Sequence, residues 1–139
     1  VGGPRGSAVL AGDPGPWLLV GDETAIPAIR RFAALIPSGT PARIVVETVN
    51  QGREIDIEAP VDVEWLHRGE APSGSALIAL IETLTAEDVV GPDPFVFIAA
   101  EQSIVKPGRA LLERWGVDTA NAVVKGYWKR DEAEYHAPH

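Results

Sequence analysis

The sequence has no cysteine, no methionine and too few basic residues to balance its acids. Without cysteine, disulfides, thiolate catalysis and zinc–thiolate sites are excluded. The formal net charge is −8, from 12 basic and 20 acidic residues, which argues against binding to nucleic acid or to an anionic membrane surface. No apolar run approaches the roughly 18 residues of a membrane-spanning helix, and no signal peptide is recognisable. We therefore expect a cytoplasmic protein with no membrane span.

Methionine is missing even from position 1, so we expect a processed or excised piece whose N-terminal neighbour is absent. The 139 residues fit one domain with a single core, and a chain of this size can fold without disulfides. Residues 1–16 are dense in Gly and Pro, which predicts a linker or hinge. We expect residues 17–130 to form the domain and the polar residues 131–139 to form a flexible tail.

Several sequence signatures of catalysis and nucleotide binding are also missing. There is no GxGxxG, no GxxxxGK[ST] and no GxSxG string. Of the three histidines, His136 and His139 have a spacing that can suit a metal, but they lie in the expected tail. We predict no metal site.

Strand-like and helix-like segments alternate along the middle of the chain. Apolar or β-branched runs predict five strands, at 16–21, 42–49, 61–66, 94–101 and 121–128. Apolar stripes at helical spacing predict three helices, at 23–37, 73–84 and 107–116. Because most of the strands are apolar on both faces, we predict a three-layer α/β fold, with a mostly parallel five-stranded sheet and helices on both faces. Ligands of such sheets bind beyond the carboxyl ends of the strands, where the strand order reverses.

The first predicted strand ends in Gly21, and two acids and a helix follow it. Proline lacks an N–H, so Pro27 belongs in the first helical turn, which predicts Thr24 as the N-cap. The N–H groups of a helix N-terminus attract anions, but Asp22 and Glu23 partly cancel that field. The two acids either accept hydrogen bonds from ribose hydroxyls or from a flavin or nicotinamide amide, or they only balance the helix dipole.

Three further strand ends carry candidate ligand-binding groups. Arg68 follows the third strand, where it is either a phosphate ligand or a solvated loop residue. Small residues and then Glu101 end the fourth strand, which either let a flat ring approach or only pack under a helix. The fifth strand ends in Tyr127 and Trp128, which either cover a planar ring or protect a sheet edge. The cations around this aromatic pair are Lys125, Lys129 and Arg130.

Five strings at these positions, in this order, resemble one family. They are "GPRGS", "LLVGDETAIPAI", "VEWLHRG", "FIAAEQ" and "GYWKR". In them the chain is similar to the siderophore-interacting proteins, flavin-dependent ferric-siderophore reductases of ferredoxin-reductase-type architecture. The resemblance runs from Gly3 to about Arg130 and corresponds to the C-terminal, NAD(P)H-binding half of the family. "GPRGS" looks like the hinge that follows the family's N-terminal FAD-binding β-barrel, and nothing in this chain resembles that barrel.

The resemblance implies a chemistry. NADPH or NADH is expected to dock on this domain and to pass hydride to FAD, which the missing N-terminal barrel mainly holds. The reduced flavin is expected to reduce Fe(III) in a ferric siderophore, so that the iron leaves as Fe(II). The isolated domain is expected to be inactive.

The resemblance also implies roles for the residues at the strand ends. Gly21 permits close approach of the nucleotide, Thr24 and Ala25 provide N–H donors, and Asp22 and Glu23 bind hydroxyl or amide groups. The other expected contacts are Arg68 with a ribose phosphate, Ala100 and Glu101 with the nicotinamide, and Tyr127 and Trp128 with the flavin. The cations Lys125, Lys129 and Arg130 are expected to attract an anionic siderophore.

Two features depart from the family pattern. Pro107 and Gly108 stand where the resemblance implies an uninterrupted helix, so we expect that helix to be shortened. Arg68 is the one clear phosphate partner, which leaves the choice between NADPH and NADH open. The alternative function is a non-catalytic binding or interaction module with the same fold. A different flavodoxin-like enzyme domain would need a phosphate loop, and the sequence offers none.

Overall fold

The structure, a computed structural model, describes residues 16–37, 39–85 and 94–128. Five strands form one sheet in the order β3-β2-β1-β4-β5, and every neighbouring pair is parallel. The strands are β1 (Trp17–Asp22), β2 (Ala42–Thr48), β3 (Val63–His67), β4 (Phe95–Glu101) and β5 (Ala122–Trp128). The predicted α/β class and all five predicted strands are confirmed.

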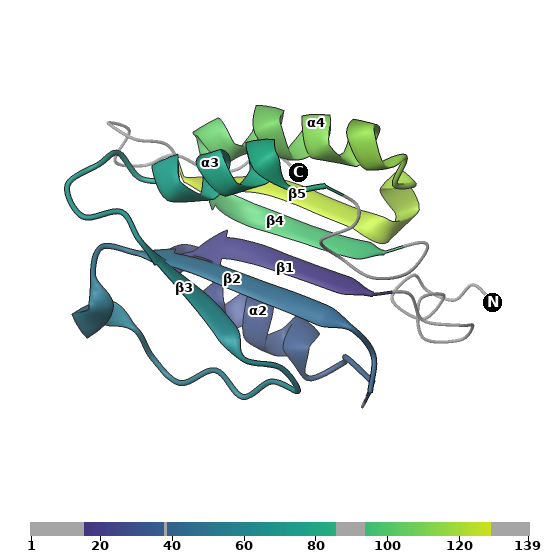
Figure 1. Ribbon diagram of the computed structural model, residues 1–139, viewed down its shortest axis with the longest axis horizontal. Coiled ribbons are helices and arrows are strands. Elements are labelled where there is room, and N and C mark those ends of the chain that lie inside the picture. Colours follow the sequence, from purple (N-terminus) through teal and green to yellow (C-terminus); the bar gives the residue numbers. More distant parts are fainter. Residues whose placement is uncertain (1–15, 38, 86–93, 129–139) are drawn as a thin grey trace.

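Helices cover both faces of the sheet (Figure 1). Helix α2 (Ile26–Ala33) packs on one face, and α3 (Ser75–Thr83) and α4 (Val105–Trp115) pack on the other. The 3₁₀ turns η1 (Glu23–Ala25) and η4 (Gln102–Ile104) lead into α2 and α4. Two further 3₁₀ turns are η2 (Gln51–Arg53) and η5 (Thr119–Asn121). The three predicted helices are therefore present.

The core consists of two apolar layers separated by the sheet. In β1, Trp17 and Leu19 face α2, whereas Leu18 and Val20 face α3 and α4. All seven residues of β4 are buried. The central strands are thus buried on both faces, as the apolar runs in the sequence indicate.

The start of α2 differs from the predicted one. Thr24 is not the N-cap, because Asp22 caps the 3₁₀ turn η1 by accepting a hydrogen bond from the backbone N–H of Thr24 at 2.9 Å. The position before α2 is Ala25, which offers no side-chain cap. Pro27 lies in the first turn of α2, as predicted. The inserted 3₁₀ turn moves the capping role two residues toward the strand.

Pro107 and Gly108, which were expected to shorten helix α4, do not break it. Helix α4 runs without a break from Val105 to Trp115. Pro107 is tolerated because it stands in the first turn, where a backbone N–H has no partner within the helix. A Cβ on Gly108 would lie 3.0 Å from Cγ1 of Val124, so this glycine lets α4 pack closely on β5.

Residues 1–15 and 129–139 lie outside the described residues, and with them most of the expected linker and the whole expected tail. The candidate siderophore residues Lys129 and Arg130 and the histidines at 136 and 139 are in these segments. Among the helices that the structure describes, none has the length and apolar character needed to cross a bilayer.

Candidate functional site

Polar side chains gather at the carboxyl edge of the sheet, next to the point where the strand order reverses. β2 and β3 lie on one side of β1, and β4 and β5 lie on the other. A pocket of about 180 Å³ opens at this edge beside the end of β1. Its lining residues come from five segments of the chain: Asp22, Glu23, Thr24, Glu47, Arg68, Ser73 and Trp128. This is where ligands bind in open parallel sheets.

Asp22 ties three parts of this edge together. Its Oδ1 accepts hydrogen bonds from the backbone N–H and the hydroxyl of Thr24. Its Oδ2 accepts a hydrogen bond from Nε1 of Trp128 at 2.9 Å, although the two residues are 106 positions apart. The Trp128 indole therefore reaches from the end of β5 to the end of β1, and Asp22 is only 6% exposed.

Glu47, at the carboxyl end of β2, is a site residue that the sequence analysis missed. The residue is almost fully buried. Its Oε1 accepts a hydrogen bond from the N–H of Gly74 at 2.8 Å, and its Oε2 accepts those of Ala76 and Leu77 at 2.9 and 3.3 Å. The carboxylate thus occupies the N-terminus of α3, where a negative charge is stabilised. The sequence did offer one signal for Glu47, which is its position. It is an acid near the end of a predicted strand, as Asp22 is after the first strand and Glu101 is in the fourth.

Arg68 lies beside Glu47, and the chain itself supplies its partners. Its Nε is 3.6 Å from Oε1 of Glu47, and one terminal nitrogen donates a hydrogen bond to the carbonyl oxygen of Ala71 at 3.0 Å. Its side chain is 22% exposed. The predicted phosphate ligand is therefore at the pocket, but it is already paired with a buried carboxylate.

Glu101 repeats the arrangement at the end of β4. One of its carboxylate oxygens accepts hydrogen bonds from the backbone N–H of Ser103, at 3.0 Å, and from the Ser103 hydroxyl. Asp22, Glu47 and Glu101 thus each occupy the N-terminus of a helical segment at the carboxyl edge. Together with Thr48, they are the buried polar side chains of the described part of the chain. At these helix ends the chain supplies its own anions.

The structure brings together only part of the predicted site. Asp22, Glu23, Thr24, Arg68 and Trp128 line the pocket. The predicted residues outside its lining are Gly21, Ala25, Ala100, Glu101, Tyr127 and Lys125. Ala25 and Ala100 are fully buried in the two apolar layers.

Gly21 is needed for the close packing of η1 and α2 against β1 and β4. A Cβ at this position would lie 2.6 Å from Cβ of Ala25 and 2.8 Å from the carbonyl oxygen of Ala99. Real Cβ atoms do not come this close to other atoms, so glycine lets η1 and α2 approach β1 and β4.

Tyr127 and Trp128 are neighbours in sequence but lie in different environments. The strand register shifts here, so that Glu101 of β4 pairs with Trp128. Trp128 turns to the pocket, whereas Tyr127 packs against the apolar layer on the α2 face. Burial raises the pKa of the Tyr127 phenol, and the positive charge of Arg31 lowers it in part. Lys125 is exposed on β5.

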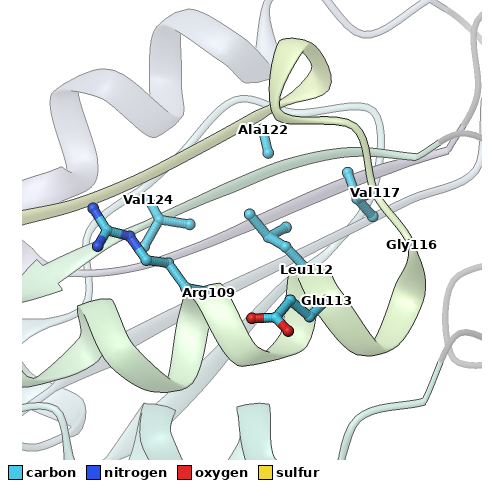
Figure 2. A pocket seen from close by; sticks show the side chains of 7 residues that line it. All are labelled: Arg109, Leu112, Glu113, Gly116, Val117, Ala122 and Val124. Atoms are coloured by element: carbon cyan, nitrogen blue, oxygen red, sulfur yellow. The ribbon is translucent and has the colours of Figure 1, made fainter.

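A larger cavity, of about 550 Å³, lies between α4 and β5 (Figure 2). Leu112, Val117 and Val124 contribute apolar wall, and Arg109 and Glu113 lie beside it on α4. None of the predicted ligand-binding residues lines it. We take the smaller pocket as the candidate site, because several polar groups converge there at the reversal of strand order. No three His, Asp or Glu side chains among the described residues form a group that could hold a metal ion.

Comparisons with known proteins agree with this architecture. A family model described as "Siderophore-interacting protein" matches residues 16–131. An uncharacterized protein of Mycobacterium bovis and one of Mycobacterium tuberculosis are each 35% identical to this chain over an alignment of 147 residues, which covers 95% of the chain and 50% of the relative. The chain thus spans about half the length of these curated relatives.

Solved structures give the same result. A siderophore utilization protein from T. fusca superposes with a TM-score of 0.74 at 28% identity, over 89% of this chain and 48% of the other. The siderophore-interacting protein SipS from Aeromonas hydrophila has a TM-score of 0.70 at 23% identity, over 86% of this chain and 48% of the other, and it supports the fold alone. Because the family model matches most of the chain and the fold agrees with that of the T. fusca protein, this chain belongs to the siderophore-interacting protein family.

Proposed function

We propose that this chain is the NAD(P)H-binding domain of a flavin-dependent ferric-siderophore reductase. In this function a nicotinamide nucleotide supplies a hydride to FAD, and single electrons from the flavin reduce Fe(III) of a ferric siderophore so that the iron is released as Fe(II). The observation that carries the proposal is the pocket at the carboxyl edge, in which polar groups from the ends of four strands converge. Family membership supports the siderophore and redox parts of the proposal.

The residues at the pocket fit one part of a nicotinamide nucleotide. Carboxylates accept hydrogen bonds from ribose hydroxyls or from an amide, and the Ser73 hydroxyl can donate or accept. The Trp128 indole provides an aromatic surface for a planar ring. The volume of about 180 Å³ is below the roughly 300–1,000 Å³ of pockets that enclose a whole ligand. The pocket therefore suits a single ring of the nucleotide, and the remainder must lie along the edge of the sheet.

The flavin and the siderophore have fewer contacts here. Of the two aromatic residues expected to border FAD, only Trp128 lies at the carboxyl edge pocket. This is consistent with a flavin held mainly by another domain. Lys125 is the described member of the cluster expected to attract an anionic siderophore, and it is exposed. Lys129 and Arg130 remain part of the proposal.

The test uses the complete encoded polypeptide. The purified protein should show a flavin absorption spectrum that bleaches with NADPH or NADH in the absence of oxygen. Adding a ferric siderophore should restore the oxidised spectrum, and an Fe(II) chelator should then develop its colour. A protein with no flavin, or a flavin that neither nucleotide reduces, would contradict the proposal.

A non-catalytic binding module is the second candidate. The observation that favours it is the occupation of the helix N-termini at the carboxyl edge by Asp22, Glu47 and Glu101. Because phosphates commonly bind at such helix ends, a chain that fills them itself lacks one common way of holding a nucleotide. This candidate predicts that neither nucleotide binds, even to the complete polypeptide.

A further inference from the structure

The indole of Trp128 is held by a residue from another strand. Its Nε1 donates a hydrogen bond to Oδ2 of Asp22 at 2.9 Å. Trp128 ends β5 and Asp22 ends β1, and β4 lies between these two strands. The indole therefore crosses the end of β4 to reach the carboxyl edge pocket, which both residues line.

The backbone of β5 alone does not fix this ring. Among the described strands β5 pairs only with β4, and the register between the two shifts where Glu101 meets Trp128. Trp128 is the last residue of its strand and is only half-buried. An indole has a single hydrogen-bond donor, so the bond to Asp22 is the polar contact that can fix the position of the ring.

Asp22 has little capacity left to bind a ligand directly. Its Oδ1 accepts hydrogen bonds from the backbone N–H and the hydroxyl of Thr24, and its Oδ2 accepts that of Trp128. The residue is also almost fully buried. Asp22 was expected to bind a hydroxyl or amide group of the nucleotide, but its carboxylate is already occupied by groups of the chain.

We infer that Asp22 is a positioning residue, which acts on the nucleotide through the Trp128 indole and not by binding the nucleotide itself. The inference rests on the proposed function, because it assigns a role to the same pocket. In it, the face of the indole is a fixed wall for the planar ring that the pocket accepts. A wall that does not move keeps this ring in one orientation for hydride transfer.

Asp22→Asn separates the two tasks of this carboxylate. The amide oxygen of asparagine accepts hydrogen bonds, whereas its nitrogen only donates them. The two donors of Thr24 take the oxygen, so that the amide nitrogen faces the indole N–H, donor against donor. Asparagine can cap such a turn, because Asn50 caps η2 by accepting the N–H of Gly52 at 2.9 Å. The substitution should therefore keep the fold and release Trp128.

The first measurement reports the hydrogen bond without any nucleotide. It is nuclear magnetic resonance of the complete polypeptide, isotopically labelled at the indole nitrogen of tryptophan. The signal of the Trp128 indole is the one that disappears in Trp128→Phe. In Asp22→Asn this signal should shift, and its proton should exchange with water about tenfold faster, as expected for the loss of a hydrogen bond to a charged group. Circular dichroism checks that both variants keep the fold.

The second measurement is the limiting rate at which saturating NADH or NADPH bleaches the flavin of the complete polypeptide, followed by anaerobic stopped-flow absorption. Asp22→Asn should lower this rate about tenfold, because the ring that orients the nucleotide is no longer fixed. Trp128→Phe should also lower it. The double variant should be no slower than Trp128→Phe alone, since Asp22 then has no indole to hold.

Asp118→Asn is the matched control. Asp118 accepts the backbone N–H of Ala120 at 2.9 Å in the 3₁₀ turn at the other end of β5, and it does not line the pocket. This variant should change neither the indole signal nor the rate. An unchanged indole signal in Asp22→Asn, or effects that multiply in the double variant, would overturn the inference while the proposed function stands. A native protein whose flavin neither nucleotide bleaches would overturn both.

Discussion

Three carboxylates are buried in the part of the chain that the structure describes. Asp22, Glu47 and Glu101 lie at the carboxyl ends of three strands, and each accepts at least one backbone N–H at the start of a helical segment. Buried charges are rare in proteins unless they are paired or hydrogen-bonded. Three N–H groups and the Arg68 guanidinium surround Glu47.

Glu47→Ala should therefore destabilise the fold far more than an ordinary surface substitution. Three backbone donors lose their acceptor and the N-terminus of α3 loses its charge, which together predicts a loss of about 2–4 kcal/mol in the free energy of unfolding. Urea denaturation followed by circular dichroism measures the loss. Glu82→Ala, on the exposed side of the same helix, should change this free energy by less than about 0.5 kcal/mol. Equal effects of the two substitutions would show that Glu47 is not a structural cap.

Tyr127 makes the free energy of unfolding depend on pH in the alkaline range. Burial raises the pKa of its phenol, and Arg31 lowers it in part. A raised pKa in the folded state means that the neutral phenol contributes stability that is complete below the pKa of the unfolded chain, about 10. This contribution is lost as the pH rises through the pKa of the folded state. Tyr127→Phe should therefore lose less stability than the native chain between about pH 9 and 12.

The pKa itself can be measured in a Tyr135→Phe background, in which Tyr127 is the one remaining tyrosine. The ultraviolet absorbance of the ionised phenol should then titrate above the value of a model tyrosine peptide. A titration at or below the value of that peptide would contradict the burial of Tyr127.

Five of the seven described residues that line the pocket could be predicted from the sequence. Asp22, Glu23, Thr24, Arg68 and Trp128 follow strands, and in a parallel sheet the ends of strands share one edge, which is how the sequence indicated them. Glu47 was missed because its partners at positions 74–77 are 27 to 30 residues away. A pattern among neighbouring residues cannot indicate a contact between residues so far apart in the sequence.

The contact of α2 with the sheet depends on one glycine. Gly21 lies under Ala25 and beside the Ala99 carbonyl oxygen, so the start of the helix lies close against β1 and β4. This contact sets the position of η1, which carries Glu23 and Thr24 to the pocket. The packing of one helix thus positions two of the residues at the candidate site.

Gly21→Ala should force this helix and the sheet apart. The added methyl group would lie 2.6 Å from Ala25 and 2.8 Å from a backbone oxygen, which predicts a loss of about 1–3 kcal/mol in the free energy of unfolding. Chemical denaturation provides the measurement. At the exposed Gly52, a Cβ would meet only the Asn50 side chain, at 3.3 Å, so Gly52→Ala is a control that should cost less than about 1 kcal/mol. If Gly21→Ala leaves the free energy of unfolding unchanged, the helix can shift away from the sheet without cost.

The elements themselves were largely predictable, and the errors have local causes. The five predicted runs became five parallel strands, of which β1 and β4 are buried along their whole length and the edge strands β3 and β5 are only partly covered. The N-cap was misplaced because the sequence does not distinguish a 3₁₀ turn from the first turn of an α-helix. Pro107 does not break α4, because the helix begins two residues before it and the proline lies in the first turn, where it is tolerated.

The chain spans about half the length of the curated relatives and of the solved structures that it matches. Under the proposed function, the flavin is held mainly by the other half. Residues 1–139 alone should therefore show no reduction of a ferric siderophore with either nucleotide, whereas the complete polypeptide should. An Fe(II)-chelator assay under anaerobic conditions, with equal molar amounts of the two proteins, measures this difference. Activity of residues 1–139 without added flavin would contradict the assignment of FAD to another domain.

The fold and the family could be inferred from the sequence because both depend on patterns spread over the whole chain. The closure of the site could not, because it depends on single contacts between distant segments. The hydrogen bond from Trp128 to Asp22 joins the last described strand to the first across β4. It brings the aromatic residue to the pocket, and its sequence neighbour Tyr127 stays on the α2 face.

The carboxylates at the helix N-termini also affect how a ligand can arrive and leave. The backbone N–H groups that they bind are satisfied before any ligand is present. A ligand then need not order these helix ends when it binds, and it leaves no buried donor unpaired when it departs. Under the proposed function the nucleotide must be exchanged once in every catalytic cycle. Because the edge keeps one conformation throughout this exchange, the spent nucleotide can leave quickly while the fold stays intact.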